Sequence, residues 1–164
     1  MDIENTRTRD YPRVNRLLIS RKDIETAIEF AAAAACEDFA KNLTVQRALI
    51  TAAIIAYVRP FSRNYDHPEA VGHLEVPLDS LTEEEHKLHN KLMTIRDKAI
   101  AHSDFEMNPV RLIMCDDGGD VTQHRMYDPL SESPEISRID SLAKKVGTEI
   151  RRALHALGAS RPTQ

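Results

Sequence analysis

Apolar residues recur at steps of three and four along four stretches of the chain, which is the pattern of an amphipathic helix. The first stretch runs from about Ser20 to Asn42. Ser20 and Asp23 resemble a helix cap, in which a hydroxyl and a carboxylate accept hydrogen bonds from the free amides of the first turn. The predicted core stripe of this helix consists of Ile24, Ile28, Ala31, Ala35 and Phe39.

The second stretch begins near Thr44 and is apolar on almost every side as far as Val58. A helix without a polar face is buried all round, so we predict that this one is the central element. Pro60 ends the helix or marks its last turn, because proline lacks the amide hydrogen that an interior position needs.

The third helix is predicted to start at Thr82, where three glutamates follow a threonine. This is a capping box, and its acidic residues lie where the helix dipole favours negative charge. The predicted core stripe consists of Leu88, Leu92, Ile95 and Ala99.

The fourth helix is predicted to start at Ser133, with Pro134 at the first helical position and Gly158 as its stop. Its core stripe consists of Ile136, Ile139, Ala143, Val146, Ile150, Ala153 and Leu157.

Two β-capable runs separate the third and fourth helices. They cover 110–115 and 121–127 and flank an Asp-Gly-Gly turn, which predicts a hairpin that acts as a flap or a cover.

The expected fold is mainly all-α, because the chain has only 5 glycines, no tryptophan and 5% aromatic residues. We predict one domain over 1–164, a bundle of four to five helices with the β-hairpin insertion at 108–129. A basic N-terminal arm at 1–19 is expected to be mobile or to form a short extra helix.

Composition places the chain among globular proteins, with 41% hydrophobic and 29% charged residues in 164 positions. No apolar run approaches the roughly 18 residues of a membrane-spanning helix, and Met1–Asn5 has no secretory layout. We therefore expect a cytoplasmic protein that does not bind membranes.

The net charge of -4 excludes sequence-blind coating of RNA, which requires a large excess of basic residues. The charge is uneven, however. Residues 1–63 hold ten Lys and Arg against eight Asp and Glu, and residues 64–164 hold twelve against eighteen. This distribution leaves room for a small basic cleft that grips a few phosphates.

The candidate chemistry lies at the end of the third helix, where Arg96 and His102 suit phosphodiester cleavage. A guanidinium clamps phosphate, and an imidazole moves protons near neutral pH. In an α-helix the two residues lie roughly 120° apart around the axis and about 9 Å apart along it. One helix therefore aims them poorly at one phosphorus atom, whereas two copies about a twofold axis would form a composite cleft.

Residues 96–102 fit the R-x(4-6)-H motif of the HEPN superfamily, with a polar residue, Asp97, directly after the arginine. The stretch Ile95–Asp104 resembles the version in abortive-infection-type HEPN proteins, and Tyr57–Tyr65 is also similar to that group. The resemblance covers the second and third helices well and the whole helical order loosely.

The resemblance implies a dimeric all-α bundle that cleaves RNA without a metal or cofactor in a defence or toxin–antitoxin setting. His102 would be the general acid or base, and Arg96 would stabilise charge on phosphorus. Asp97 would orient Arg96. An RNA, a second copy of the chain and a cognate antitoxin or regulatory protein are the expected partners.

Three further basic residues are candidates for contacts with the substrate backbone: Lys98, Arg59 and Arg63. Lys98 lies one turn before His102, and Arg59 and Arg63 lie one turn apart at the end of the second helix. The same two arginines also fit surface positions on a buried helix, with only their charged ends in water.

The sequence supports metal binding and cysteine catalysis less well. His86 and His89 have a ligand-like spacing, but a di-iron bundle needs a Glu-x-x-His motif on two helices and only one is present. Both histidines, with His67 and His73, are expected to face solvent or lie in loops. Cys36 lies in a predicted core stripe with no basic neighbour to activate it.

A non-catalytic module of the same fold, which binds a nucleotide or another protein, is the main alternative. The helix dipole alone favours a histidine at a helix C-terminus, so Arg96 and His102 also fit a structural role.

Overall fold

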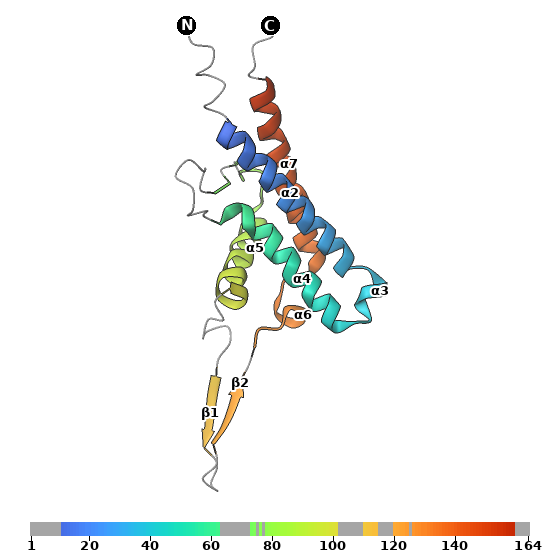
Figure 1. Ribbon diagram of the computed structural model, residues 1–164, viewed down its shortest axis with the longest axis vertical. Helices are drawn as coiled ribbons and strands as arrows, with labels where there is room; N and C mark the ends of the chain where they lie inside the picture. The colour runs from blue at the N-terminus through green and yellow to red at the C-terminus, as the bar shows by residue number, and fades with distance from the viewer. Residues whose placement is uncertain are drawn as a thin grey trace.

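The chain is mainly α-helical (Figure 1). The computed structural model describes residues 11–62, 73, 74, 76, 78–101, 110–114, 120–124 and 126–159. Its helices are α2 (Tyr11–Ala34), α3 (Glu37–Ala40), α4 (Leu43–Val58), η1 (Arg59–Phe61), α5 (Glu83–Thr94), η2 (Ile95–Ala101), α6 (Pro129–Glu132) and α7 (Ile136–Ala159).

The first long helix begins earlier than predicted. α2 starts at Tyr11, so Ser20 is not its cap but a fully buried residue inside it. The buried stripe already includes Leu17, which lies seven residues, or about two helical turns, before Ile24. Residues 11–19 are therefore the first turns of α2 rather than a separate arm, because they continue the apolar face that packs on the core. Residues 1–10 lie outside the described part of the chain.

The same helix also ends earlier than predicted. The chain leaves the α2 axis after Ala34, and the short helix α3 takes a new direction before α4 begins. Phe39 and Cys36 were expected in the core stripe but are exposed, since the break removes them from the buried face. Asn42 sets the new start, because its side chain accepts hydrogen bonds from the amides of Thr44 and Val45.

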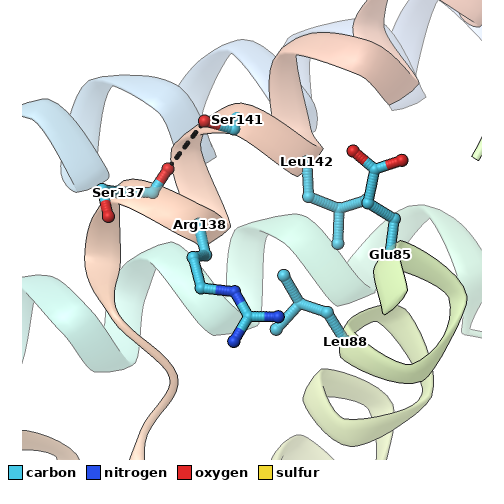
Figure 2. Close-up of a pocket in the computed structure, with 6 residues that line it drawn as sticks. All are labelled: Glu85, Leu88, Ser137, Arg138, Ser141 and Leu142. Carbon is cyan, nitrogen blue, oxygen red and sulfur yellow. Dashed lines mark hydrogen bonds between the residues drawn. The ribbon is translucent and has the colours of Figure 1, made fainter. Parts of the chain in front are cut away.

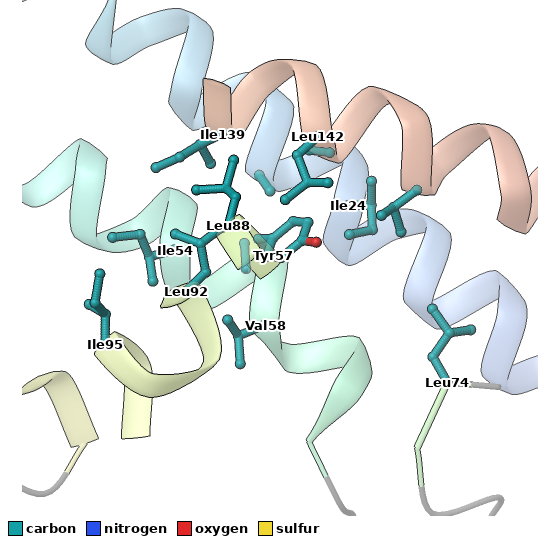
Figure 3. Packing of buried hydrophobic residues seen from close by; sticks show 14 of the residues in the cluster. Ile24, Ile54, Tyr57, Val58, Leu74, Leu88, Leu92, Ile95, Ile139 and Leu142 are labelled. Atoms are coloured by element: carbon teal, nitrogen blue, oxygen red, sulfur yellow. The ribbon is translucent and has the colours of Figure 1, made fainter. Parts of the chain in front are cut away.

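α4 is the central helix, as predicted. Figure 3 shows Tyr57 on α4 surrounded by side chains from α2, α5 and α7, among them Ile24, Leu88 and Leu142. Pro60 lies within η1, directly after α4, so the predicted helix end is confirmed.

The predicted stripes of the third and fourth helices are also confirmed. On α5 and η2, Leu88, Leu92 and Ile95 are buried and Ala99 is partly buried against the same cluster. On α7 the buried positions follow the predicted period: Ile139, Leu142, Ala143, Val146 and Ile150. A four-residue helix, α6, precedes α7 and had no signal in the hydrophobic pattern.

Two strands follow η2 in the chain. β1 (Val110–Met114) and β2 (Asp120–His124) pair antiparallel, with Val110 opposite His124 and Met114 opposite Asp120. In Figure 1 the strand pair lies at the opposite end of the molecule from the N-terminal end of α2. Residues 115–119, which hold the predicted Gly-Gly turn, are outside the described residues.

The α2–α7 contact joins helices from the two ends of the described chain, which lie side by side in Figure 1. On α2, the buried residues Ala27 and Ala31 lie three and seven positions after Ile24 and so on the same helical face. On α7, a Cβ atom added to Gly147 would lie 3.4 Å from Cγ2 of Ile24. Small side chains therefore set the close approach of these two helices.

Leu92→Ala should lower the free energy of unfolding by about 2–5 kcal/mol, because Leu92 is fully buried and alanine leaves a cavity under α4. Urea unfolding followed by circular dichroism measures the change. Leu43→Ala is the matched control: Leu43 is exposed, so the same truncation should cost less than about 1 kcal/mol. Equal losses in both variants would contradict the placement of Leu92 at the centre.

Candidate functional site

The helix that carries the candidate site is fixed at its start. Thr82 accepts a hydrogen bond from the amide of Glu85, whose carboxylate accepts one from the amide of Thr82, so the predicted capping box is confirmed. Glu85 also pairs with Lys145 of α7 at 2.5 Å. These contacts hold the pKa of Glu85 below its ordinary value, and they anchor the start of α5 to α7.

The helix changes its geometry at the predicted site. α5 ends at Thr94, and η2 continues from Ile95 to Ala101 as a π-helix. A π-helix closes hydrogen bonds from i to i+5 and has more residues in each turn than an α-helix. The spacing of Arg96 and His102 calculated for an α-helix therefore does not apply, and π-helical segments are frequent at functional sites.

Arg96 and Asp97 are brought together at the start of η2. Nη1 of Arg96 donates to Oδ1 of Asp97 at 2.6 Å, and the Arg96 side chain is 34% exposed. The guanidinium therefore lies at the edge of the core with one of its donors on a carboxylate. Lys98 is half-buried in the same π-helix. His102 and Arg63 lie outside the described residues.

Arg59 lies in η1, apart from the Arg96 segment, and pairs with Asp23 of α2. Nη1 of Arg59 lies 2.9 Å from Oδ1 of Asp23, and the two side chains are 62% and 10% exposed. Arg59 thus keeps most of its guanidinium in water while a nearly buried carboxylate holds one end.

A second arginine ties η1 to α2 at this junction. Arg16 donates to the backbone carbonyls of Pro60 at 2.5 Å and Ser62 at 3.3 Å. Within the described residues, three buried atoms on this face of α2 have no hydrogen-bond partner: Nε of Arg16, Oγ of Ser20 and Oδ2 of Asp23. Arg16 is therefore part of a polar junction between helices.

His89 of α5 is held by contacts with α4 and η1. Oη of Tyr57 and Nδ1 of His89 lie 2.9 Å apart, and Tyr57 is fully buried. The ring of His89 is perpendicular to that of Phe61, with centroids 4.6 Å apart, and meets the edge of Tyr57 at 5.9 Å. The expectation that His89 faces solvent is therefore wrong.

Burial of the His89 ring lowers its pKa, and charge on His86 lowers it further. Burial also raises the pKa of Tyr57 above its ordinary value, so the phenol keeps its proton. The hydrophobic pattern gave no signal for this pair. The sequence held one indication that His89 is partly buried: it directly follows Leu88 and so lies beside the apolar stripe of α5.

A surface pocket of about 190 Å³ lies between α5 and α7 (Figure 2). Leu88 and Leu142 are its buried apolar residues, and Arg138 and Glu85 also line it. It lies on the α7 side of α5, and its lining includes none of the predicted site residues.

Within the ranges that the structure describes, no three His, Cys, Asp or Glu side chains are grouped to hold a metal ion. No helix among those residues is both long enough and apolar enough to cross a membrane. A comparison with known proteins finds no family model, no curated protein and no solved structure that matches the chain.

His89 should make the stability of the protein depend on pH. Its pKa in the folded protein lies below the ordinary value of 6.5, so folding favours the neutral ring. This contribution is fully present above about pH 6.5 and is lost as the pH falls through the folded pKa, because the unfolded chain then binds the extra proton. Urea unfolding at steps between about pH 5 and pH 8 measures it.

His89→Asn should flatten this dependence, since asparagine does not titrate and its side-chain oxygen still accepts from Tyr57. His86→Asn is the control: His86 is exposed, and its loss should leave most of the slope. A slope that is unchanged in His89→Asn would show that another group causes it.

Proposed function

We propose that this chain is a HEPN-type helical bundle with a β-hairpin insertion and acts as a metal-independent endoribonuclease in a defence or toxin–antitoxin setting. The observation that carries the proposal is the position of the R-x(4-6)-H motif. Arg96 begins it in the first turn of a π-helix, directly after the buried Ile95. A rare helical geometry in the motif itself is typical of a functional segment.

The proposed chemistry uses the two ends of that motif. His102 takes the proton from the ribose 2′-hydroxyl, and the resulting oxyanion bonds to the adjacent phosphorus to give a 2′,3′-cyclic phosphate. The P–O5′ bond breaks, and the 5′-oxygen takes a proton from the protonated His102 of a second copy of the chain. Arg96 stabilises the charge that builds on the phosphoryl oxygens. Asp97 holds Arg96 through the contact at 2.6 Å. The need for a 2′-hydroxyl restricts the substrate to RNA.

A second copy of the chain completes the proposed site. Arg96 is partly exposed at the edge of its own core, so a twofold axis beside η2 would place two Arg96 and two His102 in one cleft. Two guanidinium groups and two imidazole groups would then surround one phosphodiester in this cleft. A cognate antitoxin or regulatory protein would act by covering it.

Three further basic residues are proposed to bind the RNA backbone on either side of the cut. Lys98 follows Arg96 in the π-helix, and Arg63 follows Arg59. Arg59 supports this role because its side chain is 62% exposed and its contact with Asp23 leaves further donors of the guanidinium in water.

One observation favours the alternative, a non-catalytic module of the same fold that binds a nucleotide or another protein. The Arg96 guanidinium already has a carboxylate partner in Asp97, which partly neutralises it. In a binding module this pair would be structural, and substitution of either residue would affect stability rather than turnover.

The proposal predicts cleavage of single-stranded RNA in excess chelator by the wild-type protein. His102→Ala should lower the rate by about 10²- to 10⁴-fold through loss of the proton carrier. Arg96→Ala should lower it by about 10²- to 10³-fold through loss of charge stabilisation. Gel analysis of a labelled oligoribonucleotide measures both, and its all-deoxy equivalent should stay intact.

Arg21→Ala is the control for the loss of positive charge. Arg21 lies on α2, is 45% exposed and pairs with Glu25, so its replacement should leave the cleavage rate unchanged. Wild-type protein that leaves the RNA intact, or equal activity in all four proteins, would favour the binding module.

A further inference from the structure

The Tyr57–His89 contact defines which ring nitrogen of His89 carries the proton. A buried phenol needs an acceptor for its hydrogen, and within the described residues the only acceptor within hydrogen-bond distance of Tyr57 Oη is Nδ1 of His89, at 2.9 Å. Tyr57 therefore donates to Nδ1. The neutral imidazole then carries its hydrogen on Nε2, and this tautomer is a hydrogen-bond donor at its outer end.

The ring is also held in position. The ring centroid of Phe61 lies 4.6 Å from that of His89, and the centroid of Tyr57 lies 5.9 Å from it, both in edge-to-face arrangements. The hydrogen bond to Tyr57 fixes the rotation of the imidazole. The Nε2–H group has no partner among the described residues. The His89 side chain is only half-buried, so the ring is not closed off from solvent. The Nε2–H donor therefore has a fixed orientation and no partner among the described residues, so it can donate a hydrogen bond to an oxygen of a bound ligand.

The donor shares one face of the helix with Arg96. Seven residues separate the two: the helix is α-helical through Thr94, and only the last two steps lie in the π-helix, so both residues lie on one side of the helix and about 10 Å apart along it. Helical side chains lean toward the N-terminus, which moves the Arg96 guanidinium toward His89. Only Nη1 of Arg96 has a partner among the described residues, so its other donors are open to a ligand.

From this geometry we infer that His89 and Arg96 form a phosphate-binding pair on one face of α5 and η2, in which His89 Nε2–H donates to a phosphoryl oxygen of RNA. The inference rests on the proposed function and adds a second point of contact, next to the phosphate that is cut. Tyr57 is the positioning residue, because its hydroxyl selects the tautomer. His89 stays neutral and serves as a donor, whereas His102 carries the proton.

The first test uses the wild-type protein and inorganic phosphate. Nitrogen-15 NMR of the histidine side chains should show His89 as the Nε2–H tautomer near pH 7, and added phosphate should shift its Nε2 signal more than that of His86. His86 lies one turn earlier on the same helix and is exposed, so it reports nonspecific effects. The Nδ1–H tautomer, or equal shifts at both histidines, would overturn the inference.

The second test compares three substitutions by oligoribonucleotide binding, all in the His102→Ala background. Asparagine places its amide oxygen near Nδ1 and lacks a donor at the Nε2 position, whereas glutamine carries an NH₂ group near Nε2. His89→Asn should therefore weaken binding about tenfold, His89→Gln should recover part of it, and His86→Asn should change it less than twofold. Inorganic phosphate added as a competitor distinguishes a site for free phosphate from a site for the strand.

Failure of this inference and failure of the proposed function give different results. If the wild-type protein cleaves RNA and His89→Asn leaves both affinity and KM unchanged, only the inference is overturned. If no RNA is cleaved or bound, both are overturned. If His89→Asn unfolds, the double variant Tyr57→Phe, His89→Phe removes both partners at once and should show the same tenfold loss.

Discussion

Tyr57 places a polar group at the centre of an otherwise apolar cluster, and the protein has to satisfy it there. The phenol is fully buried on the central helix, and its hydroxyl is bonded to His89. A buried hydroxyl without a partner costs about 1–3 kcal/mol, so this bond restricts the rotation of α5 against α4. Leu88 and Leu92 then face the core, and Arg96 lies at its edge. The position of the candidate site thus follows from the packing around one phenol.

The sequence predicted the elements whose pattern is local. The capping box at Thr82 marks where α5 begins, and the proline that follows the apolar run marks where α4 ends, at Val58. Both signals were readable because caps and proline act within one helical turn. The limits of α2 were wrong for a different reason. Its stripe extends back to Leu17, but alanine is compatible with a buried or an exposed position, so the five consecutive alanines at 31–35 did not show where the face ends.

The site was predictable only in part. Arg96 and Asp97 could be named from their spacing and are in contact, but the π-helix that holds them has no simple sequence signal. His89 was missed because its environment comes from α4 and η1, more than 25 residues earlier in the chain. A side chain whose role depends on such distant partners cannot be recognised from the period of its own helix. Tertiary contacts therefore decide which polar residues of α5 are constrained.

The pairing of α2 with α7 has a consequence for how the chain folds. The two helices come from opposite ends of the described sequence, and their contact is lined by small residues that include Gly147. The chain between them must close into a long loop before this contact forms, so the pairing raises the contact order and slows folding relative to a bundle in which only consecutive helices pack. During synthesis, α2 and α4 would emerge with their α7-facing surface uncovered until α7 leaves the ribosome. Until then the nascent chain exposes apolar surface, which is the condition that favours aggregation during folding.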